Sequence, residues 1–196
     1  MTIALRLILF ASYFSDDAAV MVEPADPSDI RASLAGDGQA YARLIRRHQQ
    51  TIAHRMRRFT RDRTILEELV HDVFVQAYFS LPRYRADAPF EHWLMAIATR
   101  VGYGHWKRQS RQIHTQNLTG SEPARSETQA EEDQLTPLLQ QLSPRDRLVV
   151  TLLYLEEHSI AEAAALTGWS QTMVKVQAFR ARGKLKKLMS RFGAHL

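Results

Sequence analysis

Apolar residues recur at three- and four-residue steps along most of this chain, the spacing that places them on one face of an α-helix. Between residues 41 and 101 the pattern predicts three amphipathic helices. Pro82 and Pro89 separate the last two, because proline cannot donate to a helical hydrogen-bond ladder. No comparable stretch alternates with period two, so we expect an all-α fold. The three apolar faces comprise Tyr41, Leu44, Ile45, His48, Ile52, Met56 and Phe59; Ile65, Leu66, Leu69, Val70, Val73, Phe74, Tyr78 and Leu81; and Phe90, Trp93, Leu94, Ile97 and Val101.

The pattern resumes after residue 138 and predicts three more helices. Ser143 and Pro144 are residue types favoured at an N-cap and at the first helical position, and apolar residues follow them. A short helix over 160–166 ends at Gly168, since glycine tolerates the left-handed turn that terminates helices. The last helix begins near Ser170, and its apolar face comprises Val174, Ala178, Ala181, Leu185 and Leu188.

The stretch between the two groups of helices is acidic and polar. It is rich in Ser, Thr, Gln and Glu and lacks helical apolar spacing, so we expect a flexible linker. The expected organisation is an N-terminal extension (1–30), a first small helical domain (31–110), the acidic linker (111–137) and a second small helical domain (138–190). Residues 31–110 hold fourteen basic and seven acidic side chains, and residues 138–196 hold nine and four. Two basic domains on one tether favour two contacts with a polyanion, with ordinary surface charge as the alternative.

The N-terminal extension is apolar up to Phe14. Arg6 interrupts this stretch and acidic residues follow it, which is atypical of a signal peptide. We expect translation to begin at Met21; the alternative is a start at Met1 with a short helix packed on the next domain. No apolar run reaches 18 residues, so we expect no membrane insertion and a cytoplasmic protein.

Residues 159–182 have the spacing of a helix-turn-helix. Ala164 lies where two helices must approach closely, Gly168 follows four residues later in the turn, and Val174 faces inward six residues after that. This spacing fits a DNA-binding motif whose second helix enters the major groove, with a plain helical hairpin as the alternative. A protein interface is the alternative for the exposed apolar residues of that helix. The candidate DNA contacts are Gln171, Thr172, Lys175, Val176, Gln177, Phe179, Arg180 and Arg182.

Aromatic and basic residues alternate along and beyond the third helix of the first domain. Aromatic faces stack on unpaired bases while cations hold the backbone, so this pattern favours binding of single-stranded or melted nucleic acid. Trp93 is assigned to the core. The candidate contacts are Arg100, Tyr103, Trp106, Lys107, Arg108 and Arg111.

The sequence does not favour an enzyme. The chain has no cysteine, which excludes disulfides, thiolate zinc sites and a cysteine nucleophile. His48 and His54 are six residues apart and do not share a helix face, and no HExxH motif, Gly-rich phosphate loop or nucleophile elbow is present. We expect no catalytic residue, no metal site, no cofactor and no small-molecule substrate.

Three segments in order resemble the sigma-70 family of bacterial RNA polymerase sigma factors, in its small extracytoplasmic-function (ECF) group. Residues 66–74 (LEELVHDVF) resemble the region 2 helix that docks on the polymerase clamp, and residues 90–98 (FEHWLMAIA) resemble the promoter-melting segment. Residues 142–155, which begin LSPRDR, resemble the opening of region 4. The resemblance extends over residues 35–188 and implies a region 2-like bundle followed by a region 4-like helix-turn-helix.

The resemblance implies a sigma factor that binds core RNA polymerase, melts the −10 element of promoter DNA with the aromatic and basic segment, and reads the −35 element with the last helix. An anti-sigma factor is a further partner that it implies. The family usually has Asp, Gln and Glu where this chain has Glu68, His71 and Asp72, and its usual GTVKSR reads TMVKVQ over 172–177. Two other classes remain as alternatives: a helix-turn-helix regulator that acts without polymerase, and a helical protein-interaction adaptor. The implied polymerase contacts are Glu67, Glu68, His71, Asp72 and Phe74.

Overall fold

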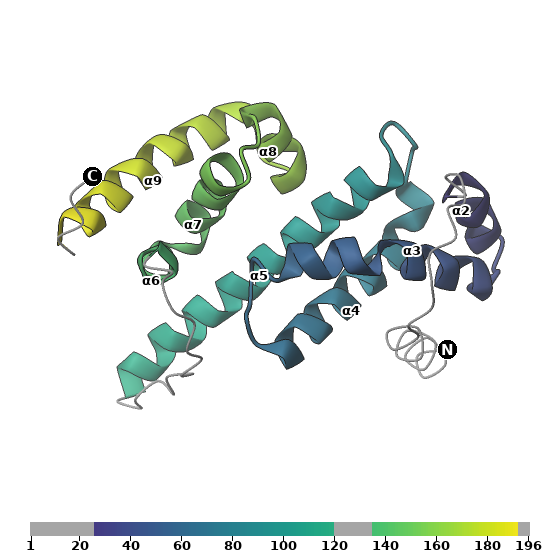
Figure 1. Cartoon of the computed structure of the whole chain (residues 1–196), viewed down its shortest axis with the longest axis horizontal. Helices are drawn as coiled ribbons and strands as arrows, with labels where there is room; N and C mark the ends of the chain where they lie inside the picture. The colour runs from purple at the N-terminus through teal and green to yellow at the C-terminus, as the bar shows by residue number, and fades with distance from the viewer. Residues whose placement is uncertain (1–25, 120–134, 192–196) are drawn as a thin grey trace. The chain divides into compact units, whose positions relative to one another are not determined.

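The computed structural model of the chain describes residues 26–119 and 135–191 (Figure 1). Every regular element in these two ranges is helical, so the prediction of an all-α fold is confirmed. The chain divides into two compact units, one ending at Gly102 and the other beginning at Tyr103. Most of the extension expected at the N-terminus and the centre of the expected acidic linker lie outside the described residues.

The first unit contains helices α2 (Asp26–Leu34), α3 (Gly38–Met56) and α4 (Arg63–Ser80), a 3-10 turn (Leu81–Arg83) and the start of α5 (Phe90–Thr119). The apolar faces expected from the sequence meet in its core. All seven positions of the first face are buried, and α4 and α5 supply most of the rest of the core, with Ile30 of α2 and Leu81 of the 3-10 turn. The large side chains that are almost completely buried here are Leu44, Ile52, Met56, Val73, Leu81 and Leu94.

Local signals in the sequence explain where α3 and α4 begin and where α4 ends. The Asp37 carboxylate accepts a hydrogen bond from the backbone N–H of Gln39, and the Asp62 carboxylate accepts one from that of Ile65. Each carboxylate therefore satisfies one of the backbone donors that a helix start leaves unpaired. Helix α4 ends at Ser80, and Pro82 lies in the 3-10 turn that follows, as expected for a residue without a backbone N–H.

Close packing of α5 on Phe59, three residues after the end of α3, requires a glycine at residue 102. A Cβ atom placed on Gly102 would lie 2.4 Å from ring carbons of Phe59, well inside van der Waals contact. Phe59 itself is 4% exposed, so its ring has little space into which to move. The absence of a side chain at this position lets the backbone of α5 pack directly on the phenylalanine ring.

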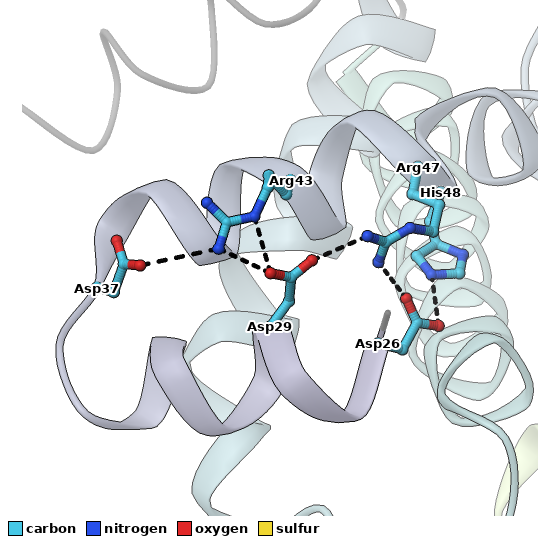
Figure 2. Close-up of polar contacts among 6 residues, drawn as sticks. All are labelled: Asp26, Asp29, Asp37, Arg43, Arg47 and His48. Carbon is cyan, nitrogen blue, oxygen red and sulfur yellow. Dashed lines mark hydrogen bonds and ion pairs between the residues drawn. The ribbon is translucent and has the colours of Figure 1, made fainter. Parts of the chain in front are cut away.

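A network of charged residues fastens α2 to α3 (Figure 2). Arg47 of α3 lies between two aspartates of α2, with ion pairs to both Asp26 and Asp29, and Arg43 pairs with Asp29 at 2.8 Å. The Nε2 atom of His48 lies 3.0 Å from the second carboxylate oxygen of Asp26. Burial raises the pKa of Asp29, but hydrogen bonds from Arg47 and Arg43 outweigh it and hold that pKa below its usual value.

The second unit contains helices α6 (Leu135–Gln140), α7 (Pro144–Val150), α8 (Ile160–Thr167) and α9 (Gln171–Arg191), and a π-helical turn (Thr151–Leu155) continues α7. The part of α5 after residue 102 belongs to the same unit. The apolar face of α9 turns inward as expected. Buried residues of this core include Leu148, Val149, Leu152, Ala163, Val174, Ala178 and Ala181.

Helices α8 and α9 form the expected helix-turn-helix. Ser159 caps α8, and its hydroxyl and the Glu162 carboxylate each accept a hydrogen bond from the other residue's backbone N–H. Gly168 ends α8 with φ +75°, the left-handed conformation that glycine adopts without steric cost. The hydroxyl of Ser170 accepts from the N–H of Met173, which starts α9. Val174 is completely buried between the helices.

The helices extend beyond three of the expected boundaries. Helix α2 begins at Asp26, inside the expected extension, and α6 begins at Leu135, inside the expected linker. Helix α5 continues to Thr119, so residues 111–119 are helical. Arg111, Gln112 and Gln116 favour helices without any apolar spacing, and extending a helix that has already formed costs far less than starting one. The hydrophobic pattern does not reveal such an extension.

Candidate nucleic-acid and protein interfaces

The outer face of α9 carries two large apolar side chains between rows of cations. Val176 is 46% exposed and Phe179 is 73% exposed. At about 100° per residue they lie on one stripe with Thr172 and Gly183, opposite the buried face. Lys175, Arg182 and Lys186 lie on one side of this stripe, and Arg180 and Lys187 lie on the other; all five are exposed.

The α9 helix as a whole is strongly basic. Its sequence, QTMVKVQAFRARGKLKKLMSR, contains seven lysines and arginines and no acidic residue. A helix with one charge sign over all its exposed length attracts a polyanion, and the major groove of DNA admits a helix of this diameter. The exposed candidates on α9 are Gln171, Thr172, Lys175, Val176, Phe179, Arg180 and Arg182.

One candidate base-reading residue, Gln177, is already hydrogen-bonded to another side chain of the second unit. Its side-chain amide donates to Asp146 Oδ1 at 2.6 Å, and Lys184 Nζ donates to Asp146 Oδ2 at the same distance. The Ser143 hydroxyl also donates to Oδ2. Burial raises the pKa of Asp146, but hydrogen bonds from Lys184, Ser143 and Gln177 hold it below its usual value. Gln177 thus joins α9 to α7, a contact that no local pattern indicates because the partners are 31 residues apart.

The middle of α4 presents acidic side chains to solvent. Glu68 and Asp72 are exposed, His71 is half-buried, and Glu67 pairs with Arg63 at 3.1 Å. The fifth candidate on this helix, Phe74, is only 2% exposed and packs in the core, so its side chain is not at this surface.

An exposed aromatic residue on the same helix was not among the residues expected from the sequence. Phe79 is 70% exposed, and at about 100° per residue it falls within about 20° of the direction of Glu68 and Asp72. Glu68, Asp72 and Phe79 are separated by four and then seven residues, a spacing that places all three on one face of a helix and so identifies Phe79 from the sequence. The exposed face of α4 therefore combines two carboxylates with one large apolar ring.

The cations of the aromatic and basic segment of α5 are open to solvent, whereas its aromatic residues are not. Arg100, Lys107, Arg108 and Arg111 are exposed. Within the second unit, the half-buried Tyr103 ring lies edge-on to Trp169, with ring centres 5.9 Å apart. Trp106 is 3% exposed, and the guanidinium carbon of Arg147 lies 3.9 Å from its ring centre. Both positions differ from the open ring faces expected of side chains that stack on bases.

The Arg147 side chain that covers Trp106 is itself removed from water. Burial lowers the pKa of Arg147 to about 10, because the charged guanidinium loses hydration. Its charge lies over the electron-rich face of the indole ring, a favourable cation–π contact that is stronger away from solvent.

Sequence comparison decides between the classes that these surfaces allow. The pattern of Sigma-70 region 2 matches residues 44–112, and that of Sigma-70, region 4 matches residues 132–185. The chain belongs to the sigma-70 family of RNA polymerase sigma factors. The region 2 match contains all of α4, and the region 4 match contains α7, α8 and most of α9.

Two curated relatives place this sigma factor with the ECF group. The sigma factor CnrH of Cupriavidus metallidurans is 29% identical, over 86% of this chain and 97% of CnrH. The ECF sigma factor SigM of Mycobacterium tuberculosis is 27% identical, over 85% of this chain and 86% of SigM. A solved structure of CnrH with the cytosolic domain of CnrY superposes with a TM-score of 0.53 at 25% identity, covering 86% of this chain and 99% of CnrH. The two-domain region 2 and region 4 architecture is confirmed.

As a sigma factor, the protein directs promoter recognition and transcription initiation by RNA polymerase. Sigma factors are initiation factors, and polymerase carries out the catalysis. Within residues 26–119 and 135–191, no three His, Cys, Asp or Glu side chains come together in a way that would hold a metal ion. No helix in the same ranges is long and apolar enough to cross a membrane.

Proposed function

We propose that this sigma factor divides its work among three helices: α4 binds core RNA polymerase, α5 captures the melted −10 element, and α9 reads the −35 element as duplex DNA. The observation that carries the proposal is the outer face of α9, which is exposed and basic and lies in the region 4 match. The protein acts in the cytoplasm, where RNA polymerase is found, and contributes no catalytic group of its own.

The proposal assigns polymerase binding to the exposed face of α4, made of Glu68, His71, Asp72 and Phe79. Two carboxylates provide charge for a basic partner surface, and the exposed phenylalanine provides apolar area that an interface would bury. Glu67 contributes less, because Arg63 already pairs with it. Phe74 acts from the core by supporting the helix, and its backbone carbonyl accepts a hydrogen bond from the Tyr41 hydroxyl.

The proposal assigns the −10 element to α5. Arg100, Lys107 and Arg111 recur at seven and four residues, and so share one exposed helix face from which they can hold a DNA backbone. Tyr103 and Trp106 would stack on bases only after leaving Trp169 and Arg147. We therefore expect capture of melted DNA to accompany a rearrangement inside the second unit.

An anti-sigma factor is the regulatory partner we expect. The sigma factor CnrH, whose fold this chain shares, was solved with the cytosolic domain of CnrY. A protein that covered either the α4 or the α9 surface would compete directly with polymerase or with DNA.

Size-exclusion chromatography with purified bacterial core RNA polymerase tests whether the chain acts with polymerase and whether α4 binds it. The wild-type chain should co-elute with core enzyme, and the variant Glu68→Lys with Asp72→Lys should not. The control variant, Asp87→Lys with Glu157→Lys, changes net charge equally at exposed acidic residues outside α4 and should still co-elute. Loss of binding in both variants, or in neither, would refute the assignment to α4. Absence of co-elution by the wild-type chain would favour a regulator that acts without polymerase.

A further inference from the structure

The stripe on the outer face of α9, made of Thr172, Val176, Phe179 and Gly183, is apolar at its centre. Scattered apolar residues are normal on protein surfaces, but a phenylalanine that is 73% exposed next to a valine that is 46% exposed is an unusual pair on a helix this basic. Neither residue is needed for the fold, since the buried face of α9 is made by Val174, Ala178 and Ala181. Within the described residues, the fold of the second unit does not require these two side chains, and their apolar surface is open to a contact beyond that unit.

We propose that Val176 and Phe179 read the C5-methyl groups of thymines in two neighbouring base pairs of the −35 element. The inference rests on the proposed entry of α9 into the major groove. The thymine methyl is the one apolar group that a base pair presents in that groove, and apolar side chains are the groups that contact it.

The spacing of the two side chains fits neighbouring base pairs. Val176 and Phe179 are three residues apart, a rise of about 4.5 Å along the helix axis. Base pairs follow one another at about 3.4 Å. Val176 and Phe179 also lie in the N-terminal half of α9. In a helix-turn-helix, the N-terminal part of the recognition helix contacts base edges.

The charges around the pair select DNA over a protein partner. Lys175 and Arg182 lie on one side of the apolar stripe and Arg180 lies on the other, all exposed, which matches a groove bordered by two phosphate backbones. An apolar protein surface would have to bring acidic residues on both sides of its contact to match the same pattern.

One polar candidate next to this apolar pair is not available to DNA. Gln177 would be the residue to recognise adenine with its amide, but it donates to Asp146 at 2.6 Å and points into the unit. With Gln177 held inside the unit, Val176 and Phe179 are the large exposed side chains at the centre of this face.

Replacement of thymine by deoxyuridine tests the inference directly, because deoxyuridine pairs identically and lacks only the methyl group. The full chain is assembled with core RNA polymerase, and promoters are identified by sequencing transcripts made in vitro. Templates are then built with single deoxyuridines in the −35 element, and with the same number in the spacer as a control. One lost methyl contact should weaken open-complex formation about four-fold, equivalent to ~0.8 kcal/mol. Spacer substitutions should have no effect.

Two variants connect the effect to the side chains. Phe179→Ala and Val176→Ala should each transcribe less from the thymine template and lose sensitivity to one particular deoxyuridine. Lys187→Ala, the matched control on the same helix, should weaken initiation on both templates equally. Circular dichroism should show wild-type helicity for all three, because every one of these side chains is exposed.

Several results would overturn the inference while leaving the proposed function intact. One is a mapped −35 element without thymine; another is equal transcription from thymine and deoxyuridine templates. A third is a Phe179→Ala variant that loses activity but keeps its full deoxyuridine sensitivity, which would assign the apolar pair to a protein contact. A wild-type chain that yields no promoter-specific transcript with core polymerase would instead refute the proposed function itself.

Discussion

Loss of the Asp146 side chain should weaken the attachment of α9 to α7. Its carboxylate is completely buried and accepts hydrogen bonds from Ser143, Gln177 and Lys184, each at 2.6 Å. Replacement by alanine removes all three. Hydrogen bonds to a charged group contribute about 1.5–3 kcal/mol each when their partners stay buried.

The partners of Asp146 are not fully buried, which reduces the expected cost. The Lys184 side chain is 57% exposed and Ser143 is also exposed, so both would regain water when the carboxylate is removed. We take about 1 kcal/mol for each lost bond, a total of about 3 kcal/mol for Asp146→Ala. At 1.36 kcal/mol per factor of ten, this is roughly a 100-fold increase in the opening of α9 from α7.

Hydrogen–deuterium exchange on the full chain measures this opening locally, since protection reports the free energy of each opening step. Amides of α7 and α9 should exchange roughly 100-fold faster in Asp146→Ala, while those of α3 and α4 keep their rates. Lys184→Ala should have a smaller effect, and Glu157→Ala, at an exposed acidic residue of the same unit, should have none. Wild-type exchange in Asp146→Ala would refute the reasoning.

The same carboxylate makes the attachment sensitive to acid. The folded protein holds the pKa of Asp146 below its unfolded value of about 3.9. The stabilisation is therefore fully present above that value and is lost as the pH falls through the folded pKa. In the wild-type chain, the amides of α7 and α9 should therefore lose exchange protection as the pH falls through the folded pKa of Asp146. In Asp146→Asn, which has no carboxylate to protonate, the protection of these amides should change less over the same pH range.

Two further predictions follow from packing and from charge. Gly102→Ala should lower the free energy of unfolding of the first unit by about 2 kcal/mol, because the new Cβ meets the Phe59 ring. Gly104→Ala, where the nearest atom is an arginine nitrogen at 3.6 Å, should be neutral or stabilising; equal urea denaturation curves for both variants would contradict the packing argument. Arg180→Ala should reduce the slope of log promoter affinity against log salt concentration by about 0.9, measured for the holoenzyme, if it neutralises one phosphate. An unchanged slope would mean that Arg180 does not contact the backbone.

The helices of this protein are readable in its sequence because their determinants are local. The apolar face around Leu44 and Ile52 requires only a repeat of three and four residues, and the start of α8 requires only Ser159 and Glu162. Gly168 marks the turn because the left-handed conformation is costly for other residues. The outer face of α9 follows from the same geometry once the inner face is identified.

The roles of several single side chains depend on tertiary partners that are distant in the chain, and the sequence does not reveal those partners. Gln177 has the chemistry of a base reader, but a carboxylate 31 residues away binds it. Trp106 has the chemistry of a stacking ring, but Arg147 covers it. Phe74 and Phe79 lie five residues apart on one helix and so face different directions, and the elements packed against α4 bury Phe74 and leave Phe79 exposed. Each outcome depends on which element packs alongside.

The separation of α9 into an inner face held by Asp146 and an outer face with no structural duty has an evolutionary consequence. Substitutions at Thr172, Val176 and Phe179 leave the buried attachment untouched. If α9 reads the −35 element as proposed, selection can therefore vary the promoter preference of this protein without first compensating for lost stability. A duplicated copy of the gene can thus acquire a new set of target genes through a few surface changes. The same separation makes these three positions the natural ones to randomise when building sigma factors that do not cross-activate each other's promoters.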